Sequence, residues 1–280
     1  MSDAVAGLAG RLLAYTNTDS VWPTAEATRA ATQTGLVIRG RVCTGDLRRL
    51  RASGYTETVV LDAGLWPHTA ASVATPMSRS APVGLFCPTL DEALAPFVTN
   101  GADVALTPSL FVRDGDWAAL AAVLRVGREA TRPDVMTLVA TDAAMLGPQR
   151  RPRFVQILDA DRGGRPLAFV FAAARNPLGM SERIGGLRAL LRAFPGSLIL
   201  GMDVLAGTDV IIHGGAAAIG VISSMRRPTR PADPSRGPLA RVGYPGCSCR
   251  GCGRPVARRS TPTGTPTPPP LPARTAAGGT

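Results

Sequence analysis

Short runs of apolar residues recur along the first 224 residues of the chain, and a longer amphipathic stretch follows most of them. The clearest runs are Glu57–Leu61, Asp103–Leu106, Val135–Ala140, Pro166–Ala172, Leu198–Leu200 and Ala218–Ser223. They are apolar at nearly every position and not at every second one, which is typical of strands buried on both faces of a parallel sheet. Strands that alternate with helices at this spacing predict a series of β/α units.

The number of these units decides between two folds. Weaker strand patterns occur at Leu12–Tyr15 and Leu36–Ile38, and helices are expected over Asp116–Val126, Ser181–Phe194 and Val204–Gly214. Eight β/α units predict a TIM-type (β/α)8 barrel in the α/β class, and a chain of this length is sufficient to form one. An open, doubly wound parallel sheet is the structural alternative.

The positive charge of the chain is concentrated near its C-terminal end. The formal net charge is +11, all 31 basic residues are arginine, and residues 225–280 carry ten arginines against the single acid Asp233. Twelve of the 25 prolines lie in the same segment. The chain is therefore expected to divide into a barrel domain at 1–227, a basic loop at 228–256 and a disordered Pro/Thr-rich tail at 257–280. The arginines suit non-specific phosphate binding, and they equally suit a solvated appendage.

Targeting signals and cysteine usage bear on the location of the protein. No apolar run reaches the length of about 18 residues that a membrane helix needs, and the first 13 residues lack the basic and apolar regions of a secretory signal. The chain is therefore expected to be cytoplasmic. Its five cysteines are an odd number, and three of them fall within six positions. In a reducing compartment such a group favours metal binding over disulfides.

The three clustered cysteines are Cys247, Cys249 and Cys252, in the pattern Cys-x-Cys-x-x-Cys. Zinc takes four nitrogen or sulfur ligands in tetrahedral geometry, and closely spaced thiolates supply several of them from one short segment. The triplet is therefore predicted to bind a structural Zn²⁺ ion. Its fourth ligand is open, because the two histidines, His68 and His213, both precede the triplet. A flexible cysteine-bearing tail without metal is the alternative.

Two segments carry a resemblance to a known family. The first is GMDVLAGTDVIIHGGAAAIGVISSMRRP at Gly201–Pro228, and the second is CSCRGC at Cys247–Cys252. A closing β/α unit followed by this cysteine pattern resembles the tRNA-guanine transglycosylase superfamily, which includes the queuine and archaeosine enzymes and the DNA deazaguanine transglycosylases. Asn100–Leu124 is similar to actinobacterial proteins of unassigned function that are distant relatives of this superfamily. The resemblance implies a barrel, a structural zinc ion, and tRNA or DNA as the partner.

The resemblance also implies a mechanism, which this sequence matches only in part. In the family one aspartate attacks the ribose C1′ and a second one transfers a proton. Leu61–Trp66 is similar to the family's Asp-Ser-Gly-Gly-Phe segment and retains Asp62 and one glycine. The segment that matches the family's nucleophile, Gly215–Val221, contains no carboxylate, and Leu106–Ser109 lacks a further family aspartate. Without the nucleophile, pentosyl transfer is not expected to run as in the family, which favours nucleic-acid binding or a regulatory role.

An unrelated barrel enzyme that acts on a small metabolite is the second hypothesis. Asp142 and Asp203, like Asp62, end predicted strands. Carboxylates at the C-terminal ends of barrel strands are placed for catalysis, so these three are candidate catalytic residues. Asp62 equally suits the cap of a turn, and the setting of Asp142 and Asp203 favours the cap of a turn or helix over a catalytic role. A barrel without present activity is the third hypothesis.

A polar group stands at the end of the last predicted strand. It consists of Ser223, Ser224, Arg226 and Arg227. Hydroxyl and guanidinium groups together bind phosphate, so this group is predicted to hold a phosphorylated metabolite or a nucleic-acid backbone. An ordinary polar rim of the barrel is the alternative.

Overall fold

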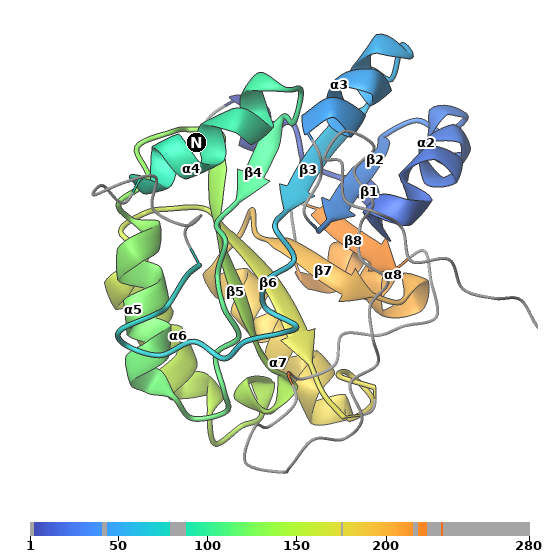
Figure 1. Ribbon diagram of the computed structural model, residues 1–280. Helices are drawn as coiled ribbons and strands as arrows, with labels where there is room; N and C mark the ends of the chain where they lie inside the picture. The colour runs from blue at the N-terminus through green and yellow to red at the C-terminus, as the bar shows by residue number, and fades with distance from the viewer. Residues whose placement is uncertain are drawn as a thin grey trace, which may run out of the picture. The chain divides into compact units, whose positions relative to one another are not determined.

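The computed structural model describes residues 3–40, 44–78, 88–174, 176–214 and 218–222, together with Pro231. Within these ranges eight parallel strands pair in chain order, and the last pairs with the first, so that the sheet is a closed barrel (Figure 1). The strands are β1 (Arg11–Asn17), β2 (Thr34–Arg39), β3 (Thr58–Asp62), β4 (Val104–Leu106), β5 (Val135–Asp142), β6 (Leu167–Ala172), β7 (Leu198–Met202) and β8 (Ala218–Ile222). The predicted (β/α)8 barrel is confirmed, and the pairing of β1 with β8 excludes the open sheet.

A helix follows each strand from β1 to β7 and packs on the outside of the barrel (Figure 1). The α-helices of the described ranges are α1 (Asp3–Ala6), α2 (Val21–Arg29), α3 (Thr44–Ala52), α4 (Leu90–Thr99), α5 (Trp117–Gly127), α6 (Arg151–Asp161), α7 (Ser181–Ala193) and α8 (Val204–Gly214). Two short 3-10 helices, η1 (Thr18–Ser20) and η2 (Ala143–Leu146), follow β1 and β5 directly. The three helices expected from the sequence correspond to α5, α7 and α8 within one residue at each end.

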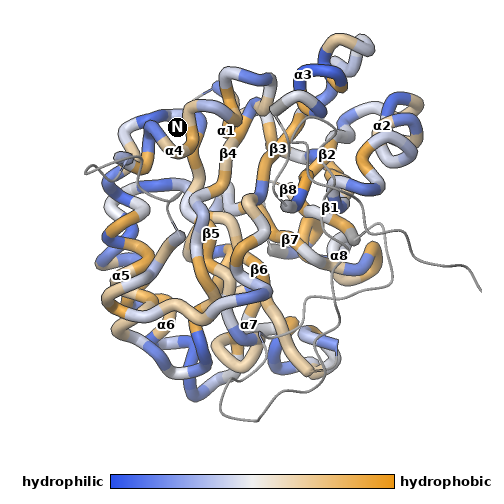
Figure 2. The backbone as a smooth tube through the Cα atoms, in the orientation of Figure 1, coloured by the Kyte–Doolittle hydropathy of each residue, from blue (hydrophilic) through white to orange (hydrophobic). Residues whose placement is uncertain are grey.

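Alternation along the strands separates two buried layers. Leu13, Val37 and Val60 belong to a cluster formed by alternate residues of all eight strands. The neighbouring residues Leu36 and Ile38 belong to a different cluster, which includes residues of the outer helices. Because successive side chains of a strand point to opposite faces, the first cluster is the barrel interior and the second lies between sheet and helices. Figure 2 shows the strands as mainly hydrophobic, with the polar residues gathered on the helices and loops.

Residues from outside the strands cover both ends of the interior. At the N-terminal end Val5 and Leu8 join the interior cluster, and at the carboxyl end Trp66 and Phe111 do so. Trp66 follows β3 and Phe111 follows β4, and a parallel bridge between Ala70 and Phe111 joins these two loops. The carboxyl ends of β3 and β4 are therefore covered, and the side chains beneath these loops are buried.

The predicted domain boundaries fall largely outside the described residues. The last strand of the barrel ends at Ile222, within the predicted barrel domain at 1–227. The predicted basic loop at 228–256 is described only at Pro231, and the predicted disordered tail at 257–280 lies outside the described residues. None of the helices that the structure describes combines the length and the apolar character needed to cross a membrane. A cytoplasmic location stays a prediction.

Candidate functional site

The register of the first three strands places three polar residues side by side at the carboxyl end of the barrel. Asn17 pairs with Arg39, and Arg39 pairs with Asp62. Each of them lies an even number of residues beyond an interior side chain, as Asp62 does beyond Val60, so all three occupy inward-facing positions. We call Asn17, Arg39 and Asp62 the mouth row. Active sites of (β/α)8 barrels lie at this face.

Asp62 is the buried end of the mouth row, with a side chain that is 1% exposed. The Tyr15 hydroxyl donates to its Oδ2 at 2.5 Å, and the Trp66 indole N–H donates to the same oxygen at 3.2 Å. The backbone N–H of Gly64 donates to Oδ1 at 2.8 Å. A carboxylate taken out of water is costly unless donors replace its hydration. These three donors satisfy that requirement and fix the orientation of the carboxylate.

Tyr15 lies in β1 with its ring in the barrel interior. Burial raises the pKa of its phenol well above the usual range, the charge of Asp62 raises it further, and Arg39 opposes this shift. The phenol is therefore neutral at physiological pH and keeps the proton that it donates to Asp62. The Tyr15–Asp62 pair is thus a neutral donor bound to a buried acceptor.

Arg39 occupies the middle of the mouth row and turns toward Asn17. Its Nε and Nη2 donate to Asn17 Oδ1 at 3.1 Å and 2.8 Å. Its Cζ lies 5.6 Å from the ring centroid of Tyr15 and 5.8 Å from that of Trp66, within the range of cation–π attraction. Arg39 and Asp62, both described, are strand neighbours without forming an ion pair.

Two glycines bring the loops after β2 and β3 into contact beside Arg39. Gly40 has φ +122° and Gly64 has φ +68°, conformations that favour glycine. A Cβ on Gly64 would lie 2.9 Å from Gly40 N and 3.0 Å from Arg39 Cγ. The backbone N–H of Gly40 also donates to the Asp62 carbonyl at 2.9 Å. The space around Arg39 therefore depends on the absence of a side chain at position 64.

The other two predicted carboxylates have capping contacts. Asp142 is the last residue of β5, is 2% exposed, and accepts a hydrogen bond from Ala144 N at 2.9 Å as the N-cap of η2. Asp203 is exposed, precedes α8 directly, and accepts from Ala206 N at 2.8 Å. No group of three or more His, Cys, Asp or Glu side chains within the described ranges could hold a metal ion. The structure therefore does not assemble Asp62, Asp142 and Asp203 into a metal site.

The remaining predicted site residues lie outside the described part of the chain. These are the phosphate-binding group Ser223, Ser224, Arg226 and Arg227, and the zinc-binding group Cys247, Cys249 and Cys252. Both assignments stay predictions. The two histidines that precede the cysteine triplet belong to the barrel domain: His68 lies in the loop after β3 and His213 in the last turn of α8.

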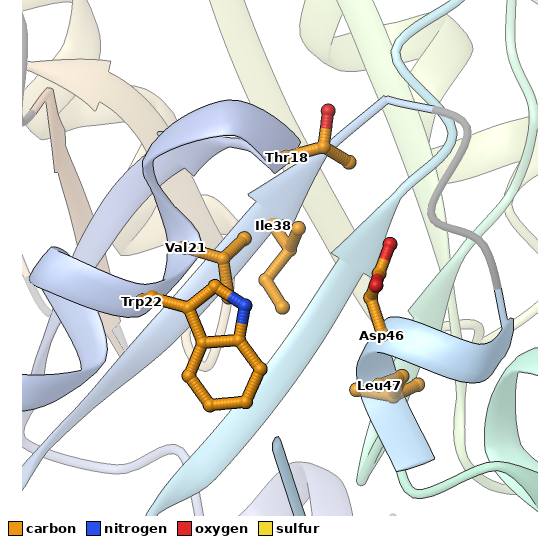
Figure 3. A pocket seen from close by; sticks show the side chains of 6 residues that line it. All are labelled: Thr18, Val21, Trp22, Ile38, Asp46 and Leu47. Atoms are coloured by element: carbon orange, nitrogen blue, oxygen red, sulfur yellow. The ribbon is translucent and has the colours of Figure 1, made fainter. Parts of the chain in front are cut away.

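A small cavity lies on the outer side of the same strand ends. It measures about 100 Å³ and is lined by Thr18, Val21, Trp22, Ile38, Asp46 and Leu47 (Figure 3). Ile38 faces the layer between sheet and helices, so the cavity lies between α2 and α3, across the ends of β1 and β2 from the mouth row. Trp22 is 46% exposed and stands over it. The cavity lining combines two polar residues, Thr18 and Asp46, with four apolar ones.

Sequence reasoning missed Tyr15, Asn17, Arg39 and Trp66 as members of this site. Asn17 and Arg39 end β1 and β2 as Asp62 ends β3. The rule that drew attention to Asp62, a polar residue at the end of an apolar strand, also applies to Arg39, which follows Leu36–Ile38. The weaker strand patterns at β1 and β2 hid this signal. The role of Tyr15 has no local signal, because its partner Asp62 lies 47 residues away.

Comparison with known proteins adds little to this description. No family model matches the chain, and no curated protein sequence matches it. Among solved structures, the chain is similar to dihydropteroate synthase from Thermus thermophilus, a structure in complex with 4-aminobenzoate, with a TM-score of 0.32 and 14% sequence identity over 76% of this chain and 87% of that chain. The resemblance to the transglycosylases gains no support from these comparisons, and the assignment of the fold rests on the closed strand pairing.

Proposed function

We propose that this chain is a barrel enzyme that acts on a small metabolite at the carboxyl ends of β1, β2 and β3. The observation that carries the proposal is the mouth row, in which a buried carboxylate, a guanidinium and an exposed amide stand at the same level of the barrel. Barrel strands place catalytic side chains at this end. A charged group that is buried, oriented by fixed donors and adjacent to an opposite charge is characteristic of functional sites.

In the proposed reaction Asp62 is the general base. Its Oδ2 accepts from both Tyr15 and Trp66, whereas Oδ1 accepts only the N–H of Gly64 among its described contacts. A carboxylate oxygen accepts more than one hydrogen bond, so Oδ1 keeps the capacity to accept a substrate proton. Tyr15 and Trp66 hold the carboxylate in place. Asp142, at an inward-facing position of β5, and Asp203, at the start of α8, stay predicted members of the site.

Substitution of Asp62 tests this proposal. The purified chain is incubated with a defined mixture of small carboxylated and phosphorylated metabolites, and their consumption is followed by mass spectrometry. We expect one metabolite to be consumed by the wild type and its consumption to fall about 100-fold or more in Asp62→Asn, which is the usual size of a general-base contribution. The matched control is Asp159→Asn, an exposed aspartate of α6, which should react like the wild type.

Two outcomes of this experiment contradict the proposal. One is that no metabolite of the mixture is consumed by the wild type. The other is that Asp62→Asn, with its thermal unfolding checked against the wild type, consumes the metabolite at an undiminished rate.

A transglycosylase-like protein that binds tRNA or DNA is the second candidate. It is favoured by the position of Asp62, which ends an early strand as the resemblance requires. In this candidate Cys247, Cys249 and Cys252 hold Zn²⁺, because thiolates are ligands that zinc prefers, and the polar group at 223–227 contacts phosphates. The described residues of β8 carry no carboxylate, so this candidate concerns binding and not base exchange.

Zinc content and RNA binding test the second candidate. We expect about one zinc per chain by elemental analysis, the number that one tetrahedral site holds. The variant with all three clustered cysteines changed to Ser should lose the metal, and the matched control with Cys43→Ser and Cys87→Ser should retain it. Fluorescence anisotropy at two salt concentrations measures tRNA binding, and we expect the metal-loaded chain to bind tRNA and the metal-free chain not to bind it. Absence of zinc from the intact protein would remove the metal assignment.

A further inference from the structure

The exposed part of the mouth row presents hydrogen-bond donors. Asn17 is exposed and Arg39 is half-buried, and the hydrogen bonds between them lie at the surface. Two of the five N–H donors of the guanidinium are engaged with Asn17 Oδ1, and among the described residues no further acceptor contacts the three donors that are left on Nη1 and Nη2 of Arg39. Because Asn17 uses its oxygen to accept from Arg39, its amide Nδ2 is also left as a donor.

We propose that Arg39 and Asn17 form an anion-binding site that holds a carboxylate or phosphate group of the substrate. That the anion belongs to a substrate rests on the function proposed above, whereas the anion site itself does not depend on catalysis. A planar guanidinium with donors on adjacent nitrogens matches the paired oxygens of a carboxylate or a phosphate. The neighbouring amide adds a donor that carries no charge.

The guanidinium is held in place before any ligand binds. Asn17 fixes two of its nitrogens, and the rings of Tyr15 and Trp66 stand within 6 Å of its Cζ. The backbone at Gly64 limits the space beside its Cγ. An arginine that is already ordered loses less side-chain entropy when an anion binds, which favours affinity.

The charge of Arg39 is also available, in contrast to that of several other arginines in the described ranges. Arg51, Arg132 and Arg188 each form an ion pair with an aspartate. Asp62 is the carboxylate of the mouth row, and Tyr15, Trp66 and Gly64 donate hydrogen bonds to its oxygens. The negative charge of Asp62, which would repel an incoming anion, is therefore buried and partly balanced by three hydrogen-bond donors.

A purely structural role for Arg39 makes a different prediction. In that role the guanidinium only covers Tyr15 and Trp66 and links the ends of β1 and β2. Its replacement would then lower stability and leave anion binding unchanged. Binding and stability must therefore be measured separately.

Titration calorimetry of the full chain tests the anion site, with inorganic phosphate and malonate as separate probes at constant ionic strength. We expect one saturable site in the wild type whose dissociation constant rises about tenfold or more in Arg39→Gln, the ratio that loss of a charge-assisted hydrogen bond produces. Arg39→Lys keeps the charge without the planar pair of donors and should bind with intermediate affinity. The matched control is Arg49→Gln, an exposed arginine of α3 that should bind like the wild type.

The two probes distinguish the source of the anion. Tighter binding of phosphate assigns a phosphorylated substrate, and tighter binding of malonate assigns a carboxylic acid. Weak binding by the arginines of residues 225–280 is common to all variants and does not affect the comparison. Equal affinity of folded Arg39→Gln and wild type for both probes overturns the proposal. If Arg39→Gln does not fold, Asn17→Ala replaces it in the test, because this variant removes the amide donor and the partner that orients Arg39. The proposal then requires that Asn17→Ala weaken anion binding at least about threefold, and a smaller effect overturns it.

The Asp62→Asn variant separates this proposal from the proposed enzyme. Saturable phosphate or malonate binding that depends on Arg39, without turnover by the wild type, leaves the anion site and removes the catalytic function. Turnover that depends on Asp62, together with anion binding that does not depend on Arg39, supports the catalytic function and removes the anion site.

Discussion

At the scale of single residues, burial of a charge explains which side chains surround Asp62. Asp62 is 1% exposed, and a carboxylate in such a place needs donors of fixed geometry. Tyr15 and Trp66 supply these donors from rings that otherwise belong to the apolar interior. Both rings then lie beside Arg39. One buried carboxylate therefore orients the two rings against which Arg39 lies.

Removal of the Tyr15 hydroxyl should destabilise the fold more than removal of another buried tyrosine hydroxyl. Tyr15→Phe takes one donor from a buried carboxylate, and we expect the free energy of unfolding to fall by about 1.5–3 kcal/mol. The matched control is Tyr55→Phe, because the Tyr55 hydroxyl is bonded to the neutral Thr28 hydroxyl at 2.9 Å. Its loss should cost about 0.5–1.5 kcal/mol. Urea unfolding measures both, and an equal or smaller effect of Tyr15→Phe would contradict the charge-assisted bond.

The raised pKa of Tyr15 also predicts how stability depends on pH. The folded-state pKa lies above the unfolded value near 10, so the unfolded chain releases this proton first. Its contribution to stability is complete below about pH 10 and is lost as the pH rises toward the folded pKa, at up to about 1.4 kcal/mol per pH unit. Tyr15→Phe should lose less stability than the wild type between about pH 9 and 11, the range around the unfolded pKa. Parallel curves for the two proteins would show that Tyr15 titrates as in the unfolded chain.

At the scale of elements, the site depends on contacts between consecutive β/α loops. The register aligns Asn17, Arg39 and Asp62 across β1, β2 and β3. The loops that follow β2 and β3 meet at Gly40 and Gly64, and both glycines have a positive φ. The loop after β3 then continues over the barrel and pairs with the loop after β4. The order of the strands thus brings together groups that are far apart in the chain.

A methyl group at position 64 should disturb this loop contact. Gly64→Ala combines a left-handed backbone, which costs about 1–2 kcal/mol for an L-residue, with a Cβ 2.9 Å from Gly40 N, and overpacking typically adds about 1–3 kcal/mol. Gly54→Ala is the matched control, because Gly54 has φ +81° and its Cβ would meet nothing within 4 Å. We expect Gly64→Ala to lower the thermal midpoint clearly more than Gly54→Ala. Equal shifts would show that the loops adjust without strain.

At the scale of the whole molecule, barrel closure and charge distribution have separate consequences. Closure follows from eight parallel strands that pair in chain order, with β8 pairing with β1. Of the net charge of +11, residues 225–280 carry +9 and leave +2 for the rest of the chain. Most of the net positive charge of the protein therefore lies in its C-terminal segment. An anion site at the mouth row must arise from local geometry and not from a general positive field.

Local patterns were sufficient to predict the six clearest strands, two weaker ones and three of the helices, since hydrophobic periodicity is encoded over a few neighbouring residues. They left a closed barrel and an open sheet as alternatives, and the pairing of β1 with β8 decided between them. They also placed Asp62 at the end of β3 and Asp142 at the end of β5. They did not separate a strand-end carboxylate with capping contacts, such as Asp203, from one held by Tyr15 and Trp66. Both types of residue have the same local sequence setting, a polar residue between a strand and a turn.

The sequence by itself thus determined the order of the clearest strands and of three helices, the separation of a nearly neutral N-terminal part from a basic C-terminal segment, and the cysteine triplet. Only the tertiary structure decided which polar residues form one site. That choice depends on the register between strands and on the loops that cover their ends. Tyr15 and Asp62 are 47 residues apart and meet because β1, β2 and β3 are neighbours in the barrel. Burial, hydrogen bonding and the shift of a pKa all follow from such long-range contacts, which no local pattern of residues specifies.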